Sequence, residues 1–179
     1  EYNFKAWDRP FILTSEIYYK YLRDIVPYEV DNVRIRYYAD QRATGYAAGI
    51  DPRINGEFVK GIESWASLSL MKTAENIKYY IGPNGNILSQ TDVNNGADYV
   101  NDTIIKGIPR PSDQRACVSV FFQDYIPFIP SFRVNMKLIF GTGLPFGAPH
   151  TERYNHNKRM SAYRRVDIGF SKQLIGETT

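Results

Sequence analysis

The chain has 179 residues, a formal net charge of +3 and a single cysteine, and 15% of its residues are aromatic. This length suffices for one domain with a hydrophobic core. The low, scattered charge gives no reason to expect nucleic acid as a partner, and one cysteine excludes an internal disulfide framework. No apolar run reaches the roughly 18 residues of a transmembrane helix. We expect no signal peptide at residues 1–4, which lack basic and apolar leader regions.

Apolar residues recur at every second position in six stretches, a spacing that predicts β-strands. In chain order the expected strands are residues 11–25, 46–55, 66–71, 115–123, 132–140 and 165–171. The clearest stretch places one apolar set on one face: Phe132, Val134, Met136, Leu138 and Phe140. Its other face carries Arg133, Asn135 and Lys137. One apolar and one polar face fits a membrane barrel with a polar lumen, and also a soluble antiparallel sheet with one solvated face.

The lengths of the connections favour the membrane interpretation. Residues 27–44, 74–112 and 143–162 form long connections, whereas residues 56–63 and 124–130 form short ones. Such alternation is typical of outer-membrane barrels, which have short periplasmic turns and long outer loops. Aromatic girdles would then lie beside the short turns, at Trp65, Tyr125, Phe128 and Phe132, and near the long loops, at Tyr37, Tyr38, Tyr79 and Tyr80. Pro52 conflicts with a regular strand, so we expect a bulge or a strand end there.

An ordered set of segments resembles the late barrel of TonB-dependent outer-membrane receptors, in particular the subgroup with an N-terminal carboxypeptidase-regulatory-like domain. The segments are residues 4–11, 18–22, 31–37, 45–51, 64–71, 110–115, 141–147 and 163–172, which include Phe4-Lys5-Ala6-Trp7-Asp8-Arg9-Pro10-Phe11 and Tyr163-Arg164-Arg165-Val166-Asp167-Ile168-Gly169-Phe170. The resemblance implies an all-β fold: an antiparallel up-and-down meander of about six strands, a segment of a large transmembrane β-barrel. Residues 1–179 would be a partial receptor barrel, with the plug and the terminal strand absent.

The same resemblance implies a receptor and transporter of the Gram-negative outer membrane that binds and imports a scarce ligand, and not an enzyme. Its implied partners are outer-membrane lipid, the remaining barrel strands, the plug, the TonB energy-coupling protein through the absent N-terminal part, and an unidentified ligand. The alternative is a soluble all-β module that binds a carbohydrate or a small apolar ligand. Its stacking platforms would come from six tyrosines: Tyr18, Tyr19, Tyr37, Tyr38, Tyr79 and Tyr80.

No motif in the chain carries a convincing catalytic, cofactor or metal site, and the ligand-binding residues stay unassigned. His150 and His156 lie in one long loop with Glu152, where we expect solvated side chains because metal sites need three or four placed ligands. The acids and amides of residues 92–102 lack the closing Glu of a calcium loop. Cys117, Glu16 and Asp51 are expected to line the polar face, with Arg115, Arg133, Lys137, Arg165 and Asp167.

Two expectations concern the whole chain. Six tilted strands are fewer than the roughly 8 that enclose a filled barrel interior, so the chain should not close on itself. It should form a sequential meander with unpaired edges, and the strands near Leu13 and Ile168 should not be paired. The loops at residues 74–112 and 143–162 should lie outside the cell and contact the ligand.

Overall fold

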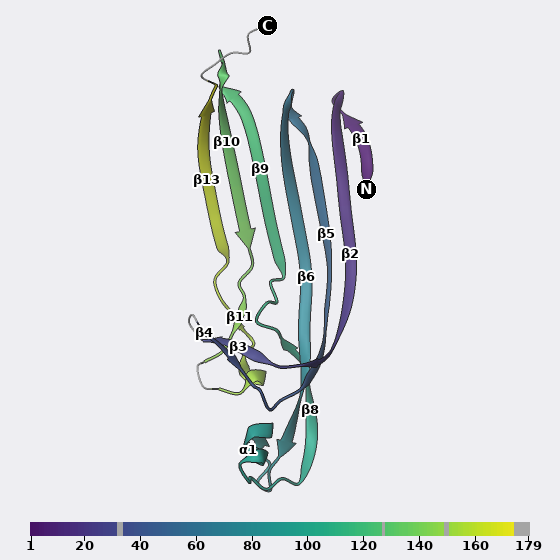
Figure 1. Ribbon diagram of the computed structural model, residues 1–179, viewed down its shortest axis with the longest axis vertical. Coiled ribbons are helices and arrows are strands. Elements are labelled where there is room, and N and C mark those ends of the chain that lie inside the picture. The colour runs from purple at the N-terminus through teal and green to yellow at the C-terminus, as the bar shows by residue number, and fades with distance from the viewer. Residues whose placement is uncertain (32–33, 127, 149–150, 174–179) are drawn as a thin grey trace.

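Long antiparallel strands dominate the computed structural model, which describes residues 1–31, 34–126, 128–148 and 151–173. The main sheet runs in the order β1, β2, β5, β6, β9, β10 and β13, each strand antiparallel to its neighbours. Their bounds are Tyr2–Ala6, Arg9–Ile25, Ala43–Val59, Ile62–Ile81, Ala116–Ile126, Ile129–Gly141 and Tyr163–Lys172. All six expected strands are present, in the expected sequential order. Figure 1 shows β1 and β13 at opposite edges of the sheet.

The sheet is open within the described residues, because β1 pairs only with β2 and β13 only with β10. The expectation that the chain does not close on itself is therefore confirmed. Beyond Leu13, moreover, β2 has no partner on its outer side, because the short β1 reaches only that far. Both edges leave backbone N–H and C=O groups without a ladder partner, an arrangement that favours pairing with further strands.

Short turns and long connections lie at opposite ends of the sheet (Figure 1). The turn between β5 and β6 consists of residues 60 and 61, and β9 and β10 are separated by residues 127 and 128. The long connections contain secondary structure that the sequence analysis did not predict. These additional elements are β3 Tyr28–Asp31, β4 Arg34–Tyr37, β7 Ile87–Leu88, α1 Gln90–Asn94, β8 Asn101–Pro109, β11 Pro145–Phe146, a 3₁₀ turn at Arg153–Asn155 and β12 Lys158–Arg159.

Two strands, β5 and β6, are longer than their hydrophobic pattern predicted, and a third, β1, was not predicted. β6 continues ten residues beyond Met71, to Ile81, and there pairs with β7 and β8 instead of β9. β5 has 17 residues, about 56 Å of extended chain at 3.3 Å per residue. β1 was missed because its turn to β2 has Trp7 and Asp8 at φ 52° and 59°, where Asn-Gly is the usual signal.

Pro52 lies inside β5 with neither a bulge nor a strand end, so the expectation of one or the other was wrong. It faces Ser15 of β2, and the register to β6 is the same before it, at Ile50 and Leu70, as after it, at Arg53 and Ser67. The pairing to β6 is interrupted only locally, at Asp51 and Pro52. The register shifts of β5 lie elsewhere. Its pairing with β2 shifts between Leu22 and Ile25, where Asp24 has a φ of 50°, and its pairing with β6 shifts between Gly56 and Val59.

The hydrophobic core is small and lies at the loop end of the sheet. Ala43, Ile77, Tyr79 and Ile108 form its buried centre, and Tyr154 is among the side chains packed against it. Burying each larger apolar side chain contributes roughly 1.5–3 kcal/mol. The loop end is therefore a folded unit, while the long strands extend from it with both faces largely open.

Candidate functional site

One face of the sheet is apolar across its whole width. The register aligns six apolar residues in a single row from β2 to β13: Leu13, Ile54, Ala66, Val120, Leu138 and Val166. Since side chains alternate along a strand, the residues two positions away lie on the same face. The face is uncovered at its edges, where Ile17 is 79% exposed and Ile168 is 64% exposed. Apolar surface this extensive marks an interaction with a membrane or with another protein.

Aromatic side chains form a band on this face at the turn end. Phe11 is the centre of a cluster, with ring centroids 5.5 Å from Phe4, 5.1 Å from Phe58 and 6.3 Å from Trp7. The band continues on the same face near the other edge of the sheet, where the ring centroids of Phe132 in β10 and Phe170 in β13 are 6.0 Å apart. Gly56 allows the Phe11 ring to lie across the neighbouring strand, because a Cβ at Gly56 would come within 2.3 Å of Phe11 Cδ1.

A second aromatic group lies toward the loop end of the same face, where Tyr19 and Tyr46 stack with centroids 6.2 Å apart. Phe11 and Tyr19 are eight residues apart on one strand, about 26 Å at 3.3 Å per residue. This separation is close to the roughly 25 Å apolar band of a transmembrane barrel. The girdle prediction was wrong for Trp65 and Tyr125, because the register places both on the polar face.

The opposite face is polar, and its side chains hydrogen-bond one another. Glu16 faces Asp51 directly, as expected for two residues that share this face, and Ser69 Oγ donates to Asp51 Oδ1 over 2.5 Å. Arg165 Nε donates to Asp167 over 2.9 Å. Cys117, a free thiol, faces Ser69. On this face Arg165 and Asp167 form an ion pair, whereas the two like charges of Glu16 and Asp51 face each other.

The polar face is covered at the loop end, which the sequence analysis did not predict. Along β6, the residues of this face are exposed to different degrees near the turns but are buried at Thr73, Glu75, Ile77 and Tyr79. The long connections cover them: Tyr154 packs edge-on against Tyr79 with centroids 5.2 Å apart. The loops therefore fold inward over the polar face instead of extending freely from the strands.

Three buried carboxylates hold the loops in place. Glu75 of β6 lies 3.1 Å from Arg153 Nε and 3.5 Å from Arg110 Nε. Asp113 accepts from the backbone N–H of Thr73 over 2.7 Å and pairs with Arg115 and Arg159. These contacts connect β6, the connection before β9 and the connection before β13.

The third carboxylate, Glu29 of β3, lies 3.3 Å from His156 Nε2 and 3.5 Å from Arg36 Nη1. Tyr38 Oη donates to Glu29 over 2.8 Å. Burial, followed by the bond to Glu29, raises the pKa of the Tyr38 hydroxyl. Burial also raises the pKa of Glu152, with further increases from Asp92 and Glu29. Arg153, His156 and Arg159 thus each pair with a different buried carboxylate.

The expectation of solvated histidines was wrong for His156, which is 7% exposed. His150 lies outside the described residues. Asp92, one of the acids considered for calcium, instead forms a capping box with Ser89 at the start of α1. Within the described ranges, no group of three or more His, Cys, Asp or Glu side chains could hold a metal ion. No helix in this part of the chain has the length and apolar character needed to cross a membrane.

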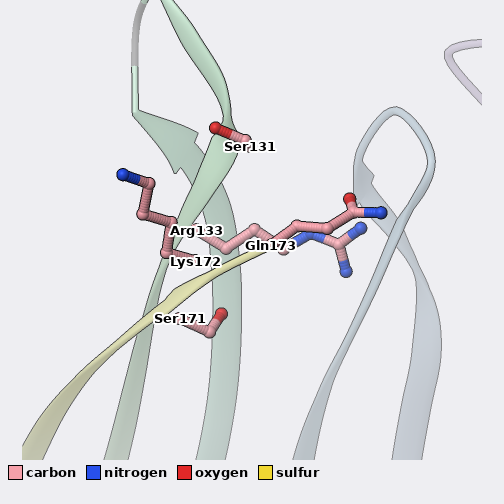
Figure 2. A pocket seen from close by; sticks show the side chains of 5 residues that line it. All are labelled: Ser131, Arg133, Ser171, Lys172 and Gln173. Carbon is pink, nitrogen blue, oxygen red and sulfur yellow. The ribbon is translucent and has the colours of Figure 1, made fainter. Parts of the chain in front are cut away.

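A hollow at the turn end, shown in Figure 2, is lined by Ser131, Arg133, Ser171, Lys172 and Gln173. Arg133 and Gln173 extend to one side, whereas Lys172 points to the other. The register explains this divergence, because Arg133 faces Ser171 while Lys172 faces Phe132, and the two rows point to opposite faces. The cations therefore do not converge on a ligand.

The tyrosines proposed as stacking platforms do not form one surface. Tyr79 is fully buried, and Tyr80 is buried against Tyr99 with a centroid distance of 4.8 Å. Tyr38 is engaged with Glu29. Tyr19 belongs to the apolar face, and the ring of Tyr18 lies over Gly49 on the polar face. Tyr37, by contrast, is 61% exposed, and its ring centroid lies 6.1 Å from that of Tyr28.

The sequence contained a signal for the loop-end cover. Beyond Met71 the alternation of β6 changes sides: Lys72, Asn76 and Lys78 follow Leu70 on one face, and Ile77 and Tyr79 lie on the other. The charges in this run favoured a loop over a strand. The partners of Glu75, which come from residues 110 and 153, could not be paired from spacing alone. No protein-family model, curated protein or solved structure matches this chain. Its function is therefore inferred from the two faces and the loop end.

Proposed function

We propose that this chain is part of the barrel of an outer-membrane receptor and transporter of the TonB-dependent type in a Gram-negative cell. In this proposal the apolar face contacts lipid, the polar face lines the lumen, and the long connections lie outside the cell. The observation that supports it most strongly is the uncovered apolar face with aromatic groups toward both ends. Transmembrane barrels have this combination of an apolar band and two aromatic girdles.

The open edges give independent support. A sheet with unpaired strands at both sides can extend by pairing with further strands, and barrel closure removes such edges. The remaining barrel strands of the same receptor are the partners that fit these edges. The plug would fit the polar face, which carries charged side chains such as Glu16, Asp51 and Arg133.

Binding and import of a scarce ligand, with energy supplied through the TonB protein, is the activity we propose for the whole receptor. Residues 93–96, at the end of α1 and just beyond it, lie far from the membrane-facing rows in this topology. Recognition usually concentrates on such loops, which a rigid scaffold holds in place. The residues that the structure describes form no arrangement that supports catalysis, and we propose no enzymatic activity.

Protease accessibility on intact cells tests the location and the topology together. A protease site inserted at residues 93–96 should be cleaved from outside in whole cells, and the protein should fractionate with the outer membrane. A site inserted at residues 60–61, in the turn between β5 and β6, is the matched control and should be cleaved only after the outer membrane is permeabilised. The reverse pattern, or recovery in the soluble fraction, would contradict the proposal.

The transport activity is tested separately. Shortening residues 93–98 should reduce uptake of the ligand without reducing the amount of protein in the outer membrane, because the strands and the core do not include these residues. Equal uptake by the shortened and the unchanged protein would show that this loop does not contribute to recognition.

A further inference from the structure

The apolar face is bordered by positive charges on the side of the long connections. Three exposed cations lie there: Arg23 on β2, Lys72 on β6 and Arg164 on β13. The Arg23 guanidinium lies 5.3 Å from the centroid of the Tyr21 ring. Arg164 faces Phe140 of the apolar stretch of β10. We call Arg23, Lys72 and Arg164 the cationic border.

The cationic border crosses the sheet obliquely. Counted from the apolar row described above, the cations lie ten residues toward the loop end on β2, six on β6 and two on β13. This shift of eight residues over five strand spacings is about 26 Å along the strands and about 24 Å across them. The resulting angle, roughly 45–50°, is near the tilt of about 35–45° that strands have in a transmembrane barrel. A plane parallel to the membrane therefore passes close to all three cations.

A shallow apolar hollow lies beside the middle cation. Its apolar lining comes from three neighbouring strands: Ile17, Ala48, Ile50 and Leu70. Lys72 lines the hollow at its loop end, where Ala48 separates it from Tyr19 in the same row. Because Ala48 carries only a methyl group, the surface is low between these two larger side chains. An acyl chain lying along the hollow would bring the phosphate at its end beside Lys72.

The acids near the loop end leave the charge of the border uncompensated. Asp102 pairs with Lys78, farther along β6, at 2.6 Å, and the buried Asp113 pairs with Arg115 and Arg159. Asp24 follows Arg23 in the chain. Among the residues that the structure describes, however, no member of the border takes part in an ion pair. The border is therefore complementary to an anionic group.

We propose that the cationic border binds the phosphate groups of anionic lipids, and that an acyl chain of one such lipid lies in the hollow beside Lys72. This inference rests on the proposed function, because it requires the apolar face to contact lipid. It adds a selection among headgroups, at the boundary between the apolar band and the long connections. Exposed Lys and Arg side chains at a membrane surface attract anionic headgroups over about one Debye length.

Lipid retention in detergent tests this proposal. The intact protein is mixed, in a non-ionic detergent, with equal amounts of anionic phosphatidylglycerol and zwitterionic phosphatidylcholine, and native mass spectrometry counts the lipids that stay bound. The preference is the ratio of bound phosphatidylglycerol to bound phosphatidylcholine, and we expect it to exceed one. Lys72→Gln should reduce the preference about five-fold, since it removes one cation from the lipid surface. Lys72→Arg keeps the charge and should keep the preference.

Lys20→Gln is the matched control. Lys20 follows Tyr19 in β2 but lies on the polar face, with its Nζ 5.9 Å from the centroid of the Tyr18 ring, so its loss should not change the preference. Equal retention of the two lipids, or equal losses in Lys20→Gln and Lys72→Gln, would overturn the border and leave the proposed function standing. Retention of neither lipid, by a protein recovered in the soluble fraction, would contradict both.

Discussion

The buried charges at the loop end show how single residues determine the position of a whole loop. Arg153 is 1% exposed and Glu75 is fully buried, so neither charge can be solvated by water if its partner is removed. The pairing could not be predicted from sequence, because it joins positions 78 residues apart that carry no local signal. The alternation that places side chains on one face is local, and it was predicted correctly for all six strands.

Removing the carboxylate of Glu75 should therefore be severe. Glu75→Ala leaves Arg110 and Arg153 near each other without their shared anion, and we expect a loss of about 3–5 kcal/mol in the free energy of unfolding. Denaturant titration of the refolded protein measures this loss. Asp167→Asn is the control, since it breaks an exposed pair with Arg165 and should change stability little. Equal effects would mean that the buried network does not stabilise the loop end.

Gly56 of β5 and Gly169 of β13 can be compared to test how closely side chains pack against the strands. An alanine at Gly56 would place its Cβ 2.7 Å from the backbone oxygen of Pro10 as well as against Phe11, whereas at Gly169 the three nearest atoms all belong to the Asn135 side chain. Gly56→Ala should destabilise by about 1–3 kcal/mol, the usual cost of overpacking, and Gly169→Ala by less, because Asn135 can rotate away. Thermal unfolding of both variants measures the difference. If Gly169→Ala proved the more harmful, the close approach of Phe11 to β5 would be disproved.

At the scale of elements, the strands were predictable and their ends were not. The hydrophobic alternation indicated where each strand lies in the sheet, but β5 and β6 continue into the loop-end core, where β6 pairs with β8 instead of β9. There the polar face is covered by the connections, so charged residues such as Glu75 lie in a strand interior. The β3–β4 hairpin and α1 were missed because elements of four or five residues carry too short a pattern to recognise.

Substitutions in the middle of β10 can test which face of the sheet contacts lipid. Met136 lies at the centre of the apolar stretch, and the neighbouring Asn135 lies on the polar face. Met136→Arg should destabilise the membrane-inserted protein by about 2–4 kcal/mol if it lies near the bilayer midplane, because lipid cannot solvate the guanidinium. Asn135→Arg should be tolerated better. Refolding yields into lipid vesicles compare the two, and equal tolerance would contradict the assignment of the faces.

At the scale of the whole molecule, the sheet combines an organised end with an open one. The loop end has a core and buried ion pairs, whereas the long strands have both edges unpaired and an apolar face uncovered. The fold class and strand order follow from local alternation, while the inward-folded loops depend on long-range ion pairs.

The most direct measurement of the central claim is an accessibility scan along β10 in lipid vesicles. Each of residues 132–140 is replaced singly by a spin-labelled cysteine in the intact protein lacking Cys117, and EPR power saturation compares collision with oxygen, which dissolves in lipid, and with a water-soluble nickel complex. We predict a period of two residues: labels at even positions should collide mainly with oxygen, and labels at odd positions should be protected from it. A scan without this period, or nickel access at the even positions, would contradict the claim that the apolar face contacts lipid.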